Sequence, residues 1–469
     1  MKGKSVHLIG ICGTAMASLA GLLKARGYEV RGSDAAAYPP MSTQLQQMGV
    51  AVAQPYDEKN LDWRPDLVVV GNAISRGNVE LERVLNDRIP FTSMADVLHR
   101  QFLADRSTIT VAGTHGKTTT TSMLSWIFET AGRAPSFLIG GVAENFGTSY
   151  AWRDQSRDFI IEGDEYDTAF FDKGPKFLHY FPDAVVLTSV EFDHADIYRD
   201  LDAVKTAFKR LVNLVPQRGR IVAYDANENV AECVAKAFCA VERYGFRQDS
   251  HWRILNVQYE KTRTTWSVER AGMPFAKFEM ALAGEYNVLN ATAAAAMATG
   301  QGIAIGDIQR AFATFQSVKR RLEVKAIVDG VTVIDDFAHH PTAIGETLKA
   351  LRTRYSGARL WAVLEPRSNT LRRNVFVNEL VDSLAIADQV VIAAVFKSEA
   401  IPELERLQPD VVVSRLRERG RPAIELADAD AIVEHIAPQV KEGDIIAILS
   451  NGGFGGIYEK LPKAITARS

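Results

Sequence analysis

Several features are scarce in this chain of 469 residues, and each absence narrows the range of functions. Cysteine occurs only three times, and Cys12, Cys233 and Cys239 have no metal-ligand spacing, which is typical of a reducing compartment. A net charge of −3 gives no general attraction to nucleic acid or to an acidic membrane. No apolar run is long enough to span a bilayer, and the N-terminus runs into a strand without a signal segment. We therefore expect a cytoplasmic protein with no nucleic-acid partner and no membrane insertion.

The chain is too long for one hydrophobic core, and strand-like and helix-like runs alternate almost throughout. This alternation predicts three α/β domains with largely parallel sheets. A charged break at 104–107 precedes the strand at 108–112, and the basic cluster at 319–321 ends the second domain. Within that domain we expect an antiparallel stretch at 252–282 and an alanine-rich helix at 290–298. The predicted domains are 1–106, 107–321 and 322–469.

The most informative segment is Gly113-Thr114-His115-Gly116-Lys117-Thr118-Thr119-Thr120, which lies between an apolar run and a helix-like segment. A strand, glycine turn and helix in this order point backbone N–H groups at phosphate. The lysine then reaches the β- and γ-phosphates, and the next hydroxyl ligates Mg²⁺. Val111 stands where the longer P-loop pattern has glycine, so an ordinary glycine-rich turn stays open as the alternative. We interpret the segment as an ATP site with Lys117 as a catalytic, solvent-lined loop residue.

A second glycine turn, Gly10-Ile11-Cys12-Gly13-Thr14, lies between a strand at 6–10 and a helix at 15–25. Dinucleotide-binding folds hold a pyrophosphate at such a turn and a ribose at an acid after the next strand, the place of Asp34. Cys12 and Ala15 interrupt the GxGxxG pattern, so we favour a UDP-type diphosphate over NAD, and a purely structural turn stays open. We interpret Cys12 as a small buried filler rather than a reactive thiol.

Acidic loops follow two strands of the second domain. Glu162-Gly163-Asp164-Glu165-Tyr166-Asp167 follows the strand at 158–162, and Glu191-Phe192-Asp193-His194-Ala195-Asp196 follows the strand at 184–188. Parallel strands present ligands at their carboxyl ends, and carboxylates there suit Mg²⁺. A single acidic loop is usually a solvated face, but two such loops on one P-loop sheet favour a two-metal phosphoryl site.

The third domain opens with a strand that ends in Asp335-Asp336-Phe337-Ala338-His339-His340-Pro341. Paired histidines occur in zinc sites, but adjacent side chains project differently and the sequence gives no third ligand nearby. We therefore favour a nucleotide-facing or interdomain contact. Arg367, Arg372 and Arg373 follow the strand at 360–364, where arginine forks suit the carboxylates of a peptide. Solvated arginines, or arginines paired with nearby acids, are the alternative.

Six motifs in this order resemble the Mur ligase family of peptidoglycan synthesis: GTHGKTTT, EGDEYD, EFDHAD, GEYNVLNATAA, KRRLE and DDFAHHPT. The resemblance implies a Rossmann-like N-terminal domain that binds a UDP-sugar, a central P-loop ATPase domain, and a C-terminal Rossmann-like domain that binds the peptide and closes the site. Family members use ATP to turn a carboxylate of a UDP-N-acetylmuramate precursor into an acyl phosphate, which an amine then attacks. We therefore expect a ligase that uses ATP and two Mg²⁺ ions.

The resemblance also implies roles for individual residues. Thr118 and Glu162 would hold one Mg²⁺, and His194 with Glu162 the second. Asn287 and Asn290 would face the nucleotide base, Arg321 and Asp336 its phosphate and ribose ends, and His115 and His339 the reacting groups. Some relatives carry a carbamylated lysine after the DHxD motif, but neither Lys205 nor Lys209 is expected to serve here. The UDP-sugar would contact Gly10, Cys12, Gly13, Thr14, Ser33, Asp34, Asn72, Ala73, Ile74 and His115.

The segments at 32–43, 365–370 and 450–456 look most like the family members that add the tripeptide L-alanyl-γ-D-glutamyl-meso-diaminopimelate to UDP-N-acetylmuramate in cell wall recycling. Addition of L-alanine is the alternative within the family. A P-loop ATPase or nucleotide-binding regulator, and an NAD(P)-dependent oxidoreductase, are alternatives from other classes. The sequence predicts neither the general base for the amine, nor the oligomeric state, nor the tolerance for other third residues in the peptide.

Overall fold

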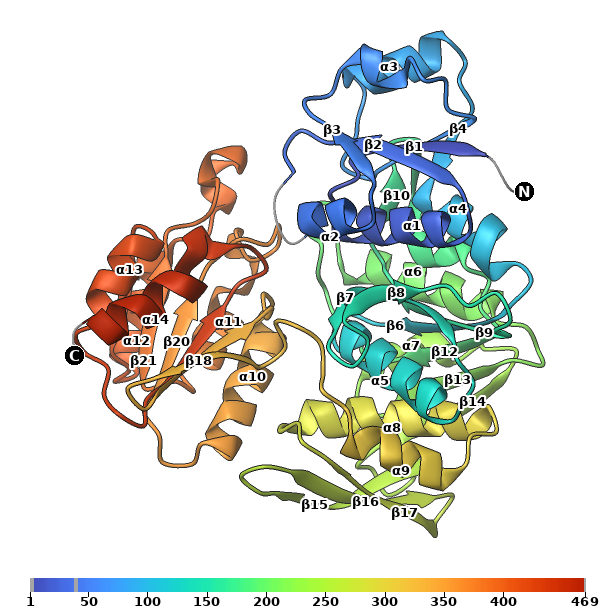
Figure 1. Ribbon diagram of the computed structural model, residues 1–469. Helices are drawn as coiled ribbons and strands as arrows, with labels where there is room; N and C mark the ends of the chain where they lie inside the picture. Colours follow the sequence, from blue (N-terminus) through green and yellow to red (C-terminus); the bar gives the residue numbers. More distant parts are fainter. Residues whose placement is uncertain (1–3, 38–40, 468–469) are drawn as a thin grey trace.

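The computed structural model describes residues 4–37 and 41–467, which form three sheet-containing units along the chain (Figure 1). Residues 38–40 belong to the 32–43 segment discussed above and lie outside the described residues. The three larger sheets are flanked by helices, which confirms the predicted fold class of three α/β domains. Within the described ranges, no helix is long and apolar enough to cross a membrane.

The N-terminal unit is a parallel sheet with strand order β3-β2-β1-β4-β5. Its strands are β1 (Ser5–Ile9), β2 (Glu29–Ser33), β3 (Ala51–Ala53), β4 (Leu67–Val70) and β5 (Phe91–Ser93). Its helices are α1 (Thr14–Ala25), α2 (Met41–Gln47), α3 (Val79–Asn86) and α4 (Met94–Leu98). From β1 the chain runs outward through β2 to β3, and it then crosses back to β4 on the other side of β1. A ligand crevice is expected at such a reversal, beyond the carboxyl ends of β1 and β4.

The central unit is built on a sheet with strand order β17-β16-β15-β14-β13-β12-β6-β9-β7-β8. Its strands are β6 (Ser107–Ala112), β7 (Ser136–Ala143), β8 (Thr148–Ala151), β9 (Asp158–Gly163), β12 (Ala184–Leu187), β13 (Arg220–Tyr224), β14 (Ala240–Gly245), β15 (Trp252–Tyr259), β16 (Thr264–Arg270) and β17 (Met273–Met280). A small hairpin stands apart, formed by β10 (Asp167–Ala169) and β11 (Asp172–Pro175). The antiparallel stretch predicted at 252–282 is confirmed by β15, β16 and β17.

The helices of the central unit are α5 (Lys117–Thr130), α6 (Leu201–Leu214), α7 (Glu228–Val234), α8 (Glu285–Gly300) and α9 (Ile305–Ala313). Alternate residues of the strands serve two cores. Ile109 and Val111 of β6 pack with α5, α8 and α9, whereas Ala112 belongs to a core that includes α6, α7 and helices of the N-terminal unit. Helix α8 contains the predicted alanine-rich helix and is longer at both ends, because its small side chains allow burial on all sides.

The C-terminal unit has strand order β18-β19-β23-β20-β21-β22, in which only β18 pairs antiparallel. The strands are β18 (Glu323–Val328), β19 (Val331–Asp336), β20 (Leu360–Leu364), β21 (Gln389–Ala393), β22 (Ala423–Leu426) and β23 (Ile445–Leu449). The helices are α10 (Pro341–Arg354), α11 (Val377–Leu384), α12 (Pro409–Glu418), α13 (Ala429–Ile436) and α14 (Ile457–Ala467). Figure 1 shows this unit beside the other two.

Candidate active site

The P-loop is the turn between β6 and α5. Gly113 (φ +134°) and Gly116 (φ +81°) adopt backbone conformations that favour glycine. A Cβ atom at Gly113 would collide with Thr188, and one at Gly116 would collide with Asn290, so neither position has room for a side chain. Gly116 is also the N-cap of α5, whose first backbone N–H groups have no partner within the helix. The predicted strand, turn and helix are therefore present, with an anion-binding helix end beside the turn.

Lys117 lies at the start of α5 and folds back over the turn. Its ammonium group donates to the carbonyl oxygens of Gly113 at 2.6 Å and Thr114 at 3.2 Å, and it contacts the Glu165 carboxylate at 2.8 Å. Burial alone would lower the pKa of Lys117, but the charge of Glu165 raises it above its ordinary value. The expectation that Lys117 lines solvent is wrong, because only 13% of its side chain is exposed.

Thr118 and Glu162 meet as predicted. The hydroxyl of Thr118 donates to Glu162 at 3.0 Å, and the second carboxylate oxygen accepts the Gly140 N–H at 2.7 Å. Burial raises the pKa of Glu162 above its ordinary value, although Lys117 acts against the shift. A hydroxyl and a carboxylate held together beside a phosphate-binding turn are the ligand types that Mg²⁺ takes, so these residues fit the ion.

His194 pairs with Glu165 rather than with Glu162. Its Nε2 atom lies 3.2 Å from the Glu165 carboxylate. Burial alone would lower the pKa of His194, but the hydrogen bond to Glu165 and the charges of Glu165 and Asp193 raise it to about 9. Glu165 therefore joins Lys117 to His194. The sequence identifies the EGDEYD motif but does not single out Glu165, because nothing in the motif shows which of its carboxylates is buried.

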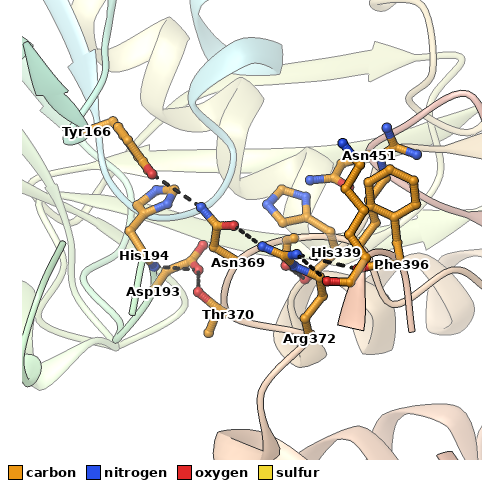
Figure 2. Close-up of a pocket in the computed structure, with 12 residues that line it drawn as sticks. Tyr166, Asp193, His194, His339, Asn369, Thr370, Arg372, Phe396 and Asn451 are labelled. Carbon is orange, nitrogen blue, oxygen red and sulfur yellow. Dashed lines mark hydrogen bonds between the residues drawn. The ribbon is translucent and has the colours of Figure 1, made fainter. Parts of the chain in front are cut away.

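The EFDHAD loop of the central unit makes hydrogen bonds to the C-terminal unit. Thr370 donates its hydroxyl to Asp193 at 2.6 Å, and Asn369 donates to Asp196 at 2.8 Å. Thr342, in the first turn of α10, donates to Glu191 at 2.7 Å. Figure 2 shows the first of these contacts, with Asp193 and His194 facing the loop after β20. This acidic loop of the central unit is therefore in direct contact with the C-terminal unit.

The adjacent histidines of the DDFAHHP segment point to different places. His340 accepts the Thr342 N–H at the start of α10 and lies 3.3 Å from the Phe192 carbonyl oxygen, so it makes the predicted interdomain contact. Its ligand atom lies within 4.8 Å of those of His115 and Glu191. These two neighbours come from distant segments of the chain, so the sequence shows no sign of them, and His339 does not belong to the group. In the structure Thr342 donates its N–H to His340 and its hydroxyl to Glu191.

A cavity of about 420 Å³ lies between the two units. Arg367 stacks on the Phe396 ring at 3.8 Å, and Arg372 donates to the side chain of Asn369 at 2.6 Å. Arg373 pairs with Glu405 and does not line the cavity. Arg367 contacts Glu365 at 3.4 Å, so the paired alternative describes both of these arginines. The side chains that line the cavity are Tyr166, Asp193, His194, His339, Arg367, Ser368, Asn369, Thr370, Arg372, Phe396, Lys397 and Asn451 (Figure 2).

The residues expected around the nucleotide are brought together only in part. Asn290 packs against Gly116 of the P-loop, and its amide nitrogen is buried without a partner. Asn287 donates to the carbonyl oxygen of Ala283, which lies just before α8. The guanidinium of Arg321 stacks on Phe337 at 5.3 Å. Asp336 is buried, and its carboxylate accepts hydrogen bonds from Leu322, Ala338 and Thr347, so it organises its own loop.

The N-terminal glycine turn holds the acid predicted beside it. The Cys12 N–H donates to Asp34 at 2.8 Å, and Gly10 packs against the buried side chain of Ile74. Burial and the nearby charge of Asp34 raise the pKa of Cys12 to about 11, which fits an unreactive thiol. Gly13, Thr14, Asn72 and Ala73 are exposed at the same edge.

Ser33 faces away from this edge. It is fully buried and donates to Glu80 at 2.5 Å, and Glu80 also contacts His7 at 3.2 Å. Lys205 and Lys209 of α6 are likewise outside the site, because both contact Glu232 at the surface.

Three family models match consecutive parts of the chain: "Mur ligase family, catalytic domain" matches residues 5–106, "Mur ligase middle domain" matches 111–298, and "Mur ligase, glutamate ligase domain" matches 320–452. The chain therefore belongs to the Mur ligase family. Members of this family are ATP-dependent ligases that form amide bonds in peptidoglycan synthesis, and they generally use Mg²⁺.

Among its relatives, the chain is similar to the UDP-N-acetylmuramate–L-alanyl-γ-D-glutamyl-meso-2,6-diaminoheptandioate ligase of Escherichia coli K12, with 42% identity and 97% of each chain covered. The ligase of the same name from Haemophilus influenzae is 41% identical, with 98% of each chain covered. A crystal structure of a murein peptide ligase from Psychrobacter arcticus superposes with a TM-score of 0.75, 37% identity and 99% of each chain covered. The UDP-N-acetylmuramate–L-alanine ligase of Geotalea daltonii is 31% identical, with 98% of each chain covered.

Proposed function

We propose that this enzyme joins L-alanyl-γ-D-glutamyl-meso-diaminopimelate to the lactyl carboxylate of UDP-N-acetylmuramate, with ATP converted to ADP and phosphate. The observation that carries the proposal is a single cavity that is lined by Arg367 and Arg372 of the C-terminal unit and by Asp193 and His194 of the central unit. The tripeptide brings several carboxylates that free L-alanine lacks, and arginine forks suit carboxylates. The full-length similarity to two ligases named for this tripeptide supports the same substrate.

The chemistry begins with activation of the carboxylate. An ionised carboxylate is a poor electrophile, so it first takes the γ-phosphoryl group of ATP and becomes an acyl phosphate. Lys117 and the N-terminus of α5 stabilise negative charge on the transferring group. Thr118 and Glu162 would hold one Mg²⁺ ion, which would offset the charge between the phosphates and the carboxylate. A second ion held by His194 and Glu162 would require His194 to leave Glu165, with which it pairs in the structure. The loops of the central and C-terminal units meet over this site and exclude the water that would hydrolyse the acyl phosphate.

The other substrates are assigned by the ends of the sheets. We place the UDP end at Gly10, Cys12 and Asp34, beyond the carboxyl end of β1. The nucleotide base lies toward Asn287 and Asn290 of α8. These assignments correspond to functional domains at 1–106, 107–321 and 322–469. Because ATP and UDP-linked precursors are cytoplasmic metabolites, we place the enzyme in the cytoplasm.

Addition of free L-alanine is the second candidate within the family, since L-alanine ligases are also similar along the whole chain. A P-loop ATPase without ligase activity would leave the cavity and the second glycine turn without a role. Oxygen-18 in the lactyl carboxylate tests the reaction. Transfer of one labelled oxygen to phosphate, with formation of UDP-N-acetylmuramoyl tripeptide, is the expected result. Phosphate without the label would contradict the proposal, and so would ATP hydrolysis at a rate that does not depend on UDP-N-acetylmuramate.

A further inference from the structure

His339 lines the cavity with a ring nitrogen that makes no hydrogen bond to the residues that the structure describes. It follows β19, at the edge of the C-terminal sheet that faces the central unit, and it lines the cavity together with His194 and Arg367 (Figure 2). The attacking amine of the peptide must pass between these walls to reach the acyl phosphate. A group that accepts the amine's proton has to lie on that route, within hydrogen-bond reach of the nitrogen.

Hydrogen bonds fix which ring nitrogen of His339 carries the proton. Nδ1 lies 2.9 Å from the carbonyl oxygen of Phe337. A carbonyl oxygen can only accept, so Nδ1 carries the hydrogen and Nε2 of the neutral ring is left with a lone pair. Nε2 has no hydrogen-bond partner among the residues that the structure describes. The backbone is held as well, because Ser368 donates its hydroxyl to the His339 carbonyl oxygen at 3.2 Å.

The surroundings keep this ring uncharged. Burial lowers the pKa of His339 below its ordinary value, and the positive charges of Arg321 and His194 act in the same direction. Asp193 and the hydrogen bond to Phe337 act against the shift. At neutral pH the imidazole is therefore a free base rather than an imidazolium ion.

The other basic side chains of the cavity are already engaged. Asp193 accepts hydrogen bonds from Thr370 and from the His194 N–H. His194 is paired with Glu165. Tyr166 donates to Asp196, and burial raises its pKa, so it is neither ionised nor free to accept the proton of an ammonium group. Arginine and lysine side chains offer no acceptor when charged.

We propose that Nε2 of His339 is the general base that removes the proton from the α-amine of the incoming peptide. This role rests on the proposed ligase function. Nε2 takes one proton from the peptide's ammonium group, and the nitrogen lone pair that this frees forms a bond to the acyl carbon. The bond between that carbon and the phosphate oxygen then breaks, phosphate leaves with the electron pair, and the second proton of the nitrogen passes to the leaving phosphate. The imidazolium ion returns its proton to solvent.

His339→Gln tests this role, because glutamine keeps a polar side chain but cannot take up a proton. Two nucleophiles are compared, each with UDP-N-acetylmuramate and ATP. Hydroxylamine is largely unprotonated at neutral pH and captures the acyl phosphate as a hydroxamate without a base. The tripeptide arrives as an ammonium ion. We expect tripeptide ligation to fall about 100-fold in the variant, while hydroxamate formation stays near the wild-type rate.

The pH profile gives a second readout that a structural defect would not produce. Ligation by His339→Gln should rise from pH 7 to pH 9, because the fraction of free peptide amine grows across its pKa of about 8. His435→Gln, the same change on α13 outside the cavity, should match the wild type in both reactions. An equal fall of hydroxamate formation and ligation in His339→Gln, or unchanged ligation, would overturn the assignment. Wild-type enzyme that forms no hydroxamate would instead overturn the ligase function itself.

Discussion

The ammonium group of Lys117 lies 2.8 Å from the carboxylate of Glu165, and their side chains are only 13% and 3% exposed. Because both charges are withdrawn from water, each depends on the other for compensation. The contact connects the start of α5 with the loop that follows β9. Lys117 is therefore held by the same carboxylate that holds His194. At the proposed ATP site, phosphate would compete with Glu165 for Lys117 when nucleotide binds.

Removal of Lys117 alone should therefore reduce both activity and stability. Lys117→Ala leaves the Glu165 carboxylate without its main partner, and we expect a loss of about 3–5 kcal/mol in the free energy of unfolding by urea denaturation. The double variant Lys117→Ala/Glu165→Gln should regain much of that stability and stay inactive. If Lys117→Ala unfolds at the same urea concentration as wild type, the buried pair does not contribute as described.

Metal dependence separates Glu162 from its neighbours. Glu162→Gln keeps the shape of the side chain but removes its negative charge, and only one of its two terminal atoms can still accept a hydrogen bond from Thr118 or Gly140. We expect the Mg²⁺ concentration for half-maximal activity to rise at least about tenfold, with lower activity at saturation. The matched control is Glu232→Gln on α7, which pairs with two surface lysines. A Glu162→Gln enzyme with the wild-type Mg²⁺ titration would place the ion elsewhere.

Neighbouring arginines provide a matched test of the peptide site. Arg367 and Arg372 line the cavity, whereas Arg373 pairs with Glu405 outside it. Arg367→Ala and Arg372→Ala should each raise KM for the tripeptide about tenfold or more and leave KM for ATP nearly unchanged. Arg373→Ala should leave both constants near wild type. Equal effects of all three substitutions on tripeptide KM would show that the cavity does not select the carboxylates.

The pairing of His194 with Glu165 predicts a pH-dependent stability. The hydrogen bond and charge of Glu165 raise the folded-state pKa of His194 to about 9, above an ordinary value of about 6.5. Stability from protonated His194 is therefore complete below pH 6.5 and is lost as the pH rises through 9. In metal-free buffer, the difference in unfolding free energy between wild type and His194→Asn should be largest near pH 6 and should shrink by pH 10. A difference that grows with pH would contradict the assigned direction.

The sequence predicted the parts of the site that depend on local chain geometry. Gly113 and Gly116 mark a turn that admits no side chain. Thr118 of α5 meets Glu162 because the turn after β6 and the end of β9 lie at the same edge of two adjacent parallel strands. Contacts between distant segments could not be predicted in this way. Glu165 rather than Glu162 receives His194, since the choice depends on how two loops fold over each other. The neighbours Arg372 and Arg373 separate only once the loop after β20 and Glu405 are in place.

The most direct test of the central claim is the choice between two amine substrates. The ratio of kcat/KM for the tripeptide to that for L-alanine can be measured by phosphate release, with saturating ATP and UDP-N-acetylmuramate. Because Arg367 and Arg372 can bind carboxylates that only the tripeptide carries, we predict a ratio of at least about 100. A preference for L-alanine would contradict the tripeptide ligase function. Phosphate release at a rate that depends on neither amine would contradict amide ligation.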